Sequence, residues 1–224
     1  MTTNRMGLEQ ALSDGCKVVY GVAINDSALM RPGKRGGITG YSAAYQTWID
    51  MIKRCYEDRT MAHNPSYRGC ETCKEWLLFS GFYKWWIGNH VDGWQLDKDL
   101  LNPGNKIYGP QKCLYIPRWL NSFTTSKKSN AGRFPTGVSY CSQTKKFKSA
   151  IRIDGKKKTL GYFTDPQSAH NAWFVAKITK AKEYKSICDD IHKDLYRGLI
   201  GTITSMHLSE ARHLKNTRTE KCHK

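Results

Sequence analysis

The fold is decided by the stretch LDKDLLNPGNKIYGPQKCLYIPRWLN, which occupies residues 96–121. Its pattern predicts a short strand with acidic residues at its end, a loop rich in Gly, Pro and Asn, a second apolar strand, and the start of a helix that carries an Asn. This order places the carboxylate of Asp97 at a strand end, opposite the side chain of Asn121 on the helix. A divalent cation fits between two such oxygen ligands.

The charge of the chain points to a polyanionic partner. The 224 residues have a formal net charge of +17 and a hydrophobic content of 39%, which suffices for one or two domains with cores. Residues 132–187 hold 12 Lys or Arg against 3 Asp or Glu, so a quarter of the chain carries over half of the excess. Nucleic acid is the usual partner of such a protein, and we expect this segment to contact double-stranded DNA.

Nothing in the sequence favours a membrane partner. No stretch approaches ~20 apolar residues, and the basic positions are not gathered on one amphipathic helix. The N-terminal residues MTTNR lead into no apolar segment, so we expect no signal peptide and a cytoplasmic protein. In that reducing compartment the eight Cys are expected to be thiols or metal ligands rather than disulfides.

Two helices are expected to brace the 96–121 stretch. In residues 41–56 apolar side chains recur at steps of three and four, which predicts a helix. A second helix is predicted from about Glu71 to Trp86, with Gly81 weakening its middle. Before them, Lys17 to Ile24 has the composition of a strand.

The strand–loop–strand–helix order resembles the ββα-metal core of HNH nucleases. That family implies a strand Asp that binds the metal ion, a following His that acts as general base, and a His or Asn on the helix as a further ligand. By position Asp97 and Asn121 would bind Mg²⁺ or Mn²⁺. Lys98 takes the place of the usual His, and a cationic Lys is a poor base but a fair phosphate clamp.

Other interpretations of this stretch stay open. Asp99 or His90 is an alternative base, although neither follows from the motif. The central Asn of the family has no clear match, because Lys112 and Cys113 stand where it is expected. Asp97 and Asp99 can also be turn and surface acids without a catalytic role.

The resemblance extends over roughly residues 17–124. The positions that carry it are Trp48, Met51, Arg54-Cys55-Tyr56, Pro65-x-Tyr67-x-Gly69, Cys73-x-x-Trp76, Phe79, Phe82, Leu96-Asp97-Lys98-Asp99, Tyr108-x-Pro110-x-x-Cys113 and Asn121. As a set they look like a group of phage-encoded HNH-type homing endonucleases. This resemblance implies an enzyme that hydrolyses phosphodiester bonds at specific DNA sites, in the host cytoplasm if the chain is phage-encoded.

A zinc site is also predicted. Cys70 and Cys73 have the two-residue gap of a zinc knuckle, and Cys55 and Cys113 would complete a four-thiolate Zn²⁺ site. The alternative is four buried thiols, since Cys55 falls on the apolar face of its helix.

The basic segment predicts a three-stranded sheet followed by a helix. Strands are expected at 137–140, 145–153 and 159–163, with a hairpin turn at Asp154-Gly155. Alternation in the middle strand turns Phe147, Ser149 and Ile151 to one face and the cations to the other. A helix then begins at Pro166, with Thr164 or Asp165 as its cap and a stripe of mostly small residues.

Gly137-Val138 and Leu160-Gly161-x-Phe163 make this segment resemble the plant Apetala-type (ethylene-response-factor) DNA-binding domain, which lays its sheet in the major groove. By position the DNA contacts would come from Ser139, Lys146, Lys148, Arg152, Lys157 and Thr159. That family usually has Trp and Arg at several of these sites. Phosphate contact is therefore better supported than base reading, and an ordinary solvated basic face is the alternative.

Together these patterns predict an α+β protein with an HNH-like ββα-metal core, helical bracing, and a three-stranded antiparallel sheet packed on one helix. The predicted parts are a nuclease domain at 1–124, a linker at 125–132, a DNA-binding domain at 133–187 and a C-terminal extension at 188–224. The expected function is a site-specific DNA endonuclease of the phage homing type. The alternatives are a catalytically inactive, sequence-specific DNA-binding protein and an RNA-binding protein, the last of which leaves the 96–121 stretch unexplained.

Overall fold

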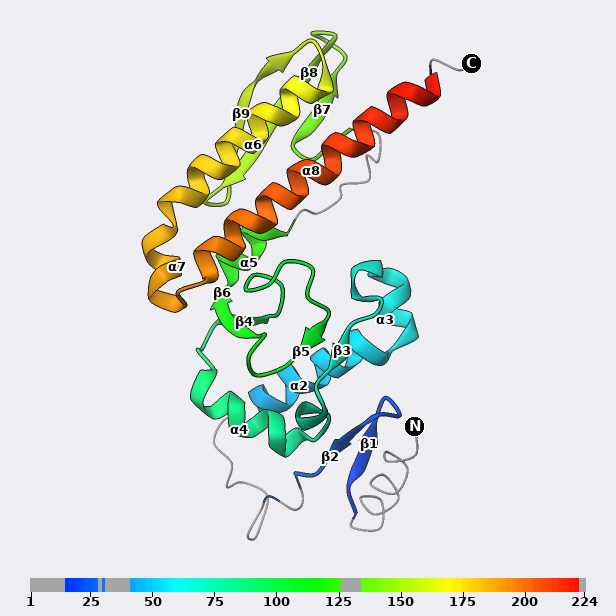
Figure 1. Cartoon of the computed structure of the whole chain (residues 1–224), viewed down its shortest axis with the longest axis vertical. Helices are drawn as coiled ribbons and strands as arrows, with labels where there is room; N and C mark the ends of the chain where they lie inside the picture. Colours follow the sequence, from blue (N-terminus) through cyan, green and yellow to red (C-terminus); the bar gives the residue numbers. More distant parts are fainter. Residues whose placement is uncertain (1–14, 28–29, 31–40, 126–133, 222–224) are drawn as a thin grey trace. The chain divides into compact units, whose positions relative to one another are not determined.

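The computed structural model describes residues 15–27, 30, 41–125 and 134–221, and it contains both helices and strands (Figure 1). The chain divides into two units, Met1–Tyr115 and Ile116–Lys224. Residues 116–124, predicted to close the first domain, therefore belong to the second unit. The predicted linker at 125–132 lies outside the described residues except for Thr125. Among the described residues, no helix has the length and apolar character needed to cross a membrane.

The first unit combines short strands with two longer helices. Its elements are β1 (Lys17–Val19), β2 (Ala23–Asn25), α2 (Tyr41–Tyr56), α3 (Asp58–His63), the 3-10 helix η1 (Pro65–Tyr67), β3 (Glu71–Thr72), the 3-10 helix η2 (Lys74–Leu77), α4 (Phe79–Asn89), β4 (Trp94–Asp97), β5 (Ile107–Tyr108) and the start of β6 (Leu114–Pro117). The helix predicted at 41–56 is confirmed. The strand predicted at 17–24 is instead a hairpin, because Tyr20 and Gly21 both adopt positive φ, 49° and 72°, and reverse the chain.

An aromatic cluster forms the core of this unit. Trp48 of α2 is fully buried and donates a hydrogen bond from Nε1 to the carbonyl of Trp76, 2.7 Å away. Its ring lies 5.4 Å from that of Phe79, edge to face, and Trp76 contacts Phe82 in the same way at 5.1 Å. Such edge-to-face pairs add stability beyond the apolar area that they bury. The core thus fixes α4 against α2.

The helix predicted from Glu71 to Trp86 is wrong in its first half. Glu71 and Thr72 form β3, which pairs in parallel with β5, and α4 begins only at Phe79. Gly81 lies within α4, and a Cβ on this residue would lie 2.1 Å from the carbonyl oxygen of Glu75. Gly81 is therefore needed for the close approach of η2 to α4, and it does not merely weaken a helix.

The second unit contains the predicted three-stranded antiparallel sheet. Its elements are the end of β6, α5 (Arg118–Thr124), β7 (Val138–Cys141), β8 (Lys146–Ile153), β9 (Lys156–Phe163), α6 (Pro166–Glu183), α7 (Lys185–Ile191) and α8 (Leu195–Lys221). The helix cap predicted before α6 is confirmed at Asp165, whose side chain accepts a hydrogen bond from the backbone N–H of Ser168 at 2.8 Å. α6 packs on one face of the sheet.

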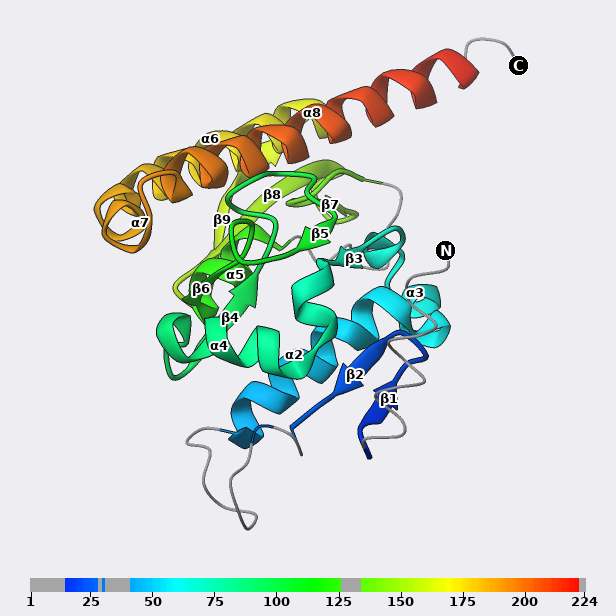
Figure 2. The same ribbon diagram turned by 60° about the horizontal axis from the view of Figure 1, so that its bottom comes forward.

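The long helix α8 lies alongside α6 in both views (Figures 1 and 2). This helix is not predicted from the sequence, whose pattern indicates only a C-terminal extension at 188–224. Leu195, Leu199 and Ile203 are fully buried, and their spacing of four places them on one face of the helix. Further along α8, the ring of His207 stacks on that of Phe174 of α6, with centroids 4.0 Å apart.

Gly137 is required where the chain enters the sheet. Its φ is +82°, and a Cβ there would lie 2.2 Å from Cδ1 of Trp173. Trp173 belongs to α6 and is 4% exposed, so it has no room to move. The carbonyl of Gly137 also accepts a hydrogen bond from the backbone N–H of Ala150 at 2.9 Å. The indole of Trp173 therefore rests directly on the backbone of Gly137.

We expect Gly137→Ala to lower the free energy of unfolding of the second unit by about 2–5 kcal/mol, since the left-handed backbone costs roughly 1–2 kcal/mol and the overpacking roughly 1–3 kcal/mol. Gly155→Ala is the matched control, because Gly155 has a φ of +76° with no atom near its would-be Cβ. It should lose only the backbone part, about 1–2 kcal/mol. Urea unfolding followed by circular dichroism measures both. Equal losses in the two variants would contradict the close packing of Trp173.

Candidate functional site

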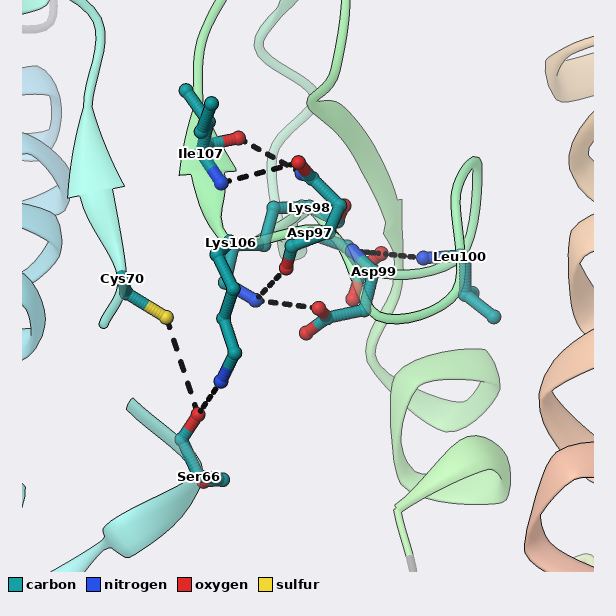
Figure 3. A network of polar contacts seen from close by, with 9 residues as sticks. Ser66, Cys70, Asp97, Lys98, Asp99, Leu100, Lys106 and Ile107 are labelled. Carbon is teal, nitrogen blue, oxygen red and sulfur yellow. Dashed lines mark hydrogen bonds and ion pairs between the residues drawn. The ribbon is translucent and has the colours of Figure 1, made fainter. Parts of the chain in front are cut away.

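Asp97 ends β4 and is buried, with 8% of its surface exposed. Its Oδ1 accepts hydrogen bonds from the backbone N–H groups of Asp99 at 3.0 Å and Leu100 at 2.8 Å, so the carboxylate is held by its own loop (Figure 3). Burial raises the pKa of Asp97 to about 6, although these two hydrogen bonds oppose the rise. Burying a charged carboxylate disfavours folding at neutral pH, so a carboxylate that is retained in such a place is a candidate functional residue.

Lys98 points into the same loop and not toward solvent. Its side chain is 5% exposed. Its Nζ donates to Oδ1 of Asp99 and to the carbonyl of Asn105, the latter at 2.9 Å (Figure 3). The ammonium also lies 5.6 Å from the centre of the Tyr108 ring. A residue that clamps a phosphate needs an accessible and unneutralised charge. The ammonium of Lys98 is instead buried and neutralised by Asp99.

Asn105 closes the loop, and sequence analysis did not single it out. Its Nδ2 donates to the carbonyls of Lys98 at 2.9 Å and Ile107 at 2.8 Å, while its Oδ1 accepts from the backbone N–H of Ile107 at 3.1 Å. One side chain therefore joins the residue after β4 to the first residue of β5. The available signal was the Asn-Pro-Gly-Asn loop, since Asn side chains commonly bond to nearby backbone in turns.

His90, the alternative base, is held by aromatic rings. It stacks on Trp86 with centroids 4.2 Å apart and meets Tyr115 edge to face at 5.0 Å. Its Nε2 lies 3.0 Å from Oδ1 of the exposed Asp92. The structure therefore pairs His90 with Asp92 and with the aromatic core, whereas Asp99 is paired with Lys98.

Asn121 lies in α5, which begins directly after β6. Its backbone carbonyl accepts hydrogen bonds from the hydroxyls of Thr124 at 2.8 Å and Thr125 at 2.7 Å, and these bonds help to end the helix. Asp97 belongs to the first unit and Asn121 to the second. Their joint action as metal ligands stays a prediction.

Three of the four cysteines of the predicted zinc site are buried, and the fourth, Cys73, is partly buried. The thiol of Cys55 accepts a hydrogen bond from the Thr72 hydroxyl at 3.6 Å, and that of Cys70 donates to the carbonyl of Ser66 at 4.0 Å. Burial raises the pKa of Cys55 to about 11 and that of Cys113 to about 12. Among the residues that the structure describes, which include all four of these cysteines, no group of three or more His, Cys, Asp or Glu side chains lies close enough together to hold a metal ion. Zinc stays a prediction that metal analysis decides.

All six predicted DNA contacts lie on one face of the sheet. Ser139 is opposite Lys148 in the register, Arg152 is opposite Lys157, and Thr159 is opposite Ala150. Side chains opposite one another share a face, and residues two apart along β8 share it as well, so Lys146 joins them. The other face of β8 carries Phe147, Ser149 and Ile151, of which the last two are buried. The predicted alternation is confirmed.

One further residue on this face was missed by sequence analysis. Tyr162 is opposite Lys148 and 45% exposed, and the Lys148 ammonium lies 5.8 Å from the centre of its ring. The signal was obscured by an irregularity in the pairing between Ser149 and Ala150, which interrupts the alternation of β9. Elsewhere on the face, Arg152 donates to the carbonyl of Gly155 at 3.0 Å, which orients its guanidinium along the hairpin.

Comparison of this chain with models of protein families, with curated proteins and with solved structures finds no match.

We expect Asp97→Asn to stabilise the protein above pH 6. The folded state raises the pKa of Asp97 from 3.8 to about 6, so the native chain binds the proton more tightly and loses stability as pH rises through this window. Asn keeps the Oδ1 acceptor and removes the buried charge. The gain at pH 7.5 should be roughly 1–3 kcal/mol, and the stability should fall less steeply than that of wild type as pH rises from 4 to 6. Urea unfolding over a pH series measures it.

Asp99→Asn is the control of opposite sign. Asp99 is 54% exposed on its side chain and neutralises the buried ammonium of Lys98, so its amide variant should lose stability. If Asp97→Asn also loses stability at pH 7.5, the carboxylate of Asp97 is a structural turn acid.

Proposed function

We propose that the chain is a site-specific DNA endonuclease of the phage homing type, in which the β7–β9 sheet holds the duplex. The observation that carries this proposal is the placement of Ser139, Lys146, Lys148, Arg152, Lys157 and Thr159 on one exposed face of that sheet. The opposite face is buried under α6, so the cations cannot turn inward without exposing the core.

The dimensions of this face suit the major groove. Neighbouring strands lie about 4.8 Å apart, so the outer two strands are separated by roughly 10 Å. The major groove of B-DNA is about 12 Å wide and accepts a two-stranded β-ribbon, so two neighbouring strands of this sheet can enter it. In this pose Lys146 and Lys148 reach toward phosphates, while Arg152 can grip a guanine edge with two hydrogen bonds.

The cleavage part of the proposal rests on the Asp97 loop. Asp97 and Asn121 would bind Mg²⁺ or Mn²⁺, which when bound stabilises the charge on the phosphate and the leaving oxygen. The residues around Asp97 suit this task, because Asp99 and Leu100 orient its carboxylate and Lys98 is held by Asp99 and Asn105. This geometry gives Lys98 a supporting role in the loop. The general base is then expected to be another side chain and not Lys98.

The second candidate is a sequence-specific DNA-binding protein without catalysis. The observation that favours it is Lys98, which stands at the usual position of the base and is buried in an ion pair. This protein would keep the basic sheet and its affinity for DNA. The two candidates differ only in cleavage.

We expect wild-type protein to nick supercoiled plasmid in the presence of Mg²⁺ and to stop when the metal is chelated. Asp97→Ala and Asn121→Ala should each abolish cleavage, since each removes one proposed oxygen ligand of the metal. Because neither residue lies on the basic sheet, both variants should change the dissociation constant for DNA by less than about threefold. Gel analysis of plasmid forms and a binding titration measure these effects. No metal-dependent nicking by wild type, with DNA binding intact, selects the second candidate.

We expect DNA binding to weaken steeply with salt. Each cation that neutralises a phosphate contributes about 0.9 to the fall of log K with log salt, where K is the association constant for DNA. The predicted face carries four cations, so the expected slope is about −3 to −4. They are Lys146, Lys148, Arg152 and Lys157. Lys148→Ala should lower that slope by about one unit. Lys158→Ala is the matched control, because Lys158 is opposite the buried Ile151 and lies on the other face of the same sheet. Equal changes in slope for the two variants would count against binding through the predicted face.

A further inference from the structure

The helix α5 packs into the same unit as the basic sheet. Phe123 is 7% exposed, and its ring meets that of Tyr184 edge to face, with centroids 5.2 Å apart. The Trp119 ring lies 4.6 Å from the same tyrosine. Tyr184 is the residue between α6 and α7. Two aromatic side chains of α5 therefore pack on one residue at the end of α6.

Tyr184 also contacts the turn of the β8–β9 hairpin. Its hydroxyl donates to Oδ1 of Asp154 at 3.5 Å, and Lys180 bonds to the other oxygen of the same carboxylate at 3.4 Å. Asp154 is in the turn that joins β8 to β9, between Arg152 and Lys157. A continuous path of contacts thus runs from α5 through Tyr184 to the tip of the basic hairpin.

A second path runs through Lys177 of α6. This residue is 7% exposed, and its ammonium lies 3.6 Å from the centre of the Phe123 ring and 5.7 Å from that of Trp173. An ammonium over an aromatic face is attracted by the ring electrons, and more strongly where water is excluded. Because Trp173 rests on Gly137 at the start of the sheet, this path also joins α5 to the sheet.

We propose that Phe123 and Tyr184 are positioning residues that fix the helix carrying Asn121 to the DNA-binding sheet, so that cleavage falls at a set number of base pairs from the bound sequence. This inference rests on the proposed nuclease function. In this proposal, side-chain packing sets the distance along the DNA between the bound sequence and the cut. The length of the peptide that joins α5 to β7 does not set it.

The first experiment lengthens that peptide in the full chain. Six Gly and Ser residues are inserted after Lys128, and cut positions are mapped on end-labelled DNA that contains the bound sequence. We expect a shift of less than one base pair. If the peptide set the distance, six flexible residues would add about 13 Å of reach, or about four base-pair steps. Cuts spread over several base pairs would overturn the proposal.

The second experiment removes the packing. In the lengthened protein, Phe123→Ala combined with Tyr184→Ala should broaden the cuts to several base pairs and leave the affinity for DNA within about threefold. Tyr184→Phe keeps the ring and should keep the cuts narrow. Phe123→Leu guards against simple unfolding, because it retains an apolar side chain and should broaden the cuts less than Ala. Cuts that stay narrow in the double variant would overturn the proposal.

Hydrogen exchange separates this inference from the proposed function, since it requires no cleavage. The amides of residues 119–124 should exchange at least tenfold faster in the double variant than in wild type, while those of β8 stay within threefold. If wild type does not cut DNA, the proposed nuclease function is refuted. The exchange rates then still test whether Phe123 and Tyr184 hold α5 against the rest of its unit. Unchanged exchange in α5 would refute the fixed attachment whether or not the protein cuts.

Discussion

Burial of one face of β8 against α6 determines how the second unit presents its charge. Ser149 and Ile151 are buried on the helix side, and side chains alternate along a strand, so Lys148 and Arg152 must face outward. A shift of the register by one residue would bury the cations and expose the apolar residues. Gly137 adds to this constraint, because Trp173 occupies the space that any other side chain would need. The cationic face therefore follows from packing on the opposite side of the sheet.

The first unit shows the opposite balance, in which a polar loop is retained at some cost to stability. Burial raises the pKa of Asp97, and a charged carboxylate in this place destabilises the folded chain at neutral pH. Asn105 and Lys98 hold the loop in shape through hydrogen bonds to its backbone and to Asp99. Such a trade of stability for a fixed, partly desolvated carboxylate is common at catalytic sites.

The packing of α5 changes where the boundary between the two parts of the chain lies. The sequence pattern predicts a linker at 125–132 between a nuclease domain and a DNA-binding domain. In the structure, α5 belongs to the unit of the sheet, and Phe123 and Tyr184 join it to α6 and the hairpin. A helix held by several aromatic contacts has a defined position relative to the sheet, which a flexible peptide alone does not provide.

The sequence by itself determined the elements whose signals are local. The apolar spacing of residues 41–56 gave α2, the Asp154-Gly155 pair gave the hairpin, and strict alternation gave the faces of β8. Tertiary structure decided what local patterns do not encode. Glu71 lies in a strand because it pairs with Ile107, 36 positions away. The long helix α8 packs against α6, and its residues Leu195, Leu199 and Ile203 are fully buried. Such contacts depend on partners distant in the chain, so no window of neighbouring residues contains the reason for them.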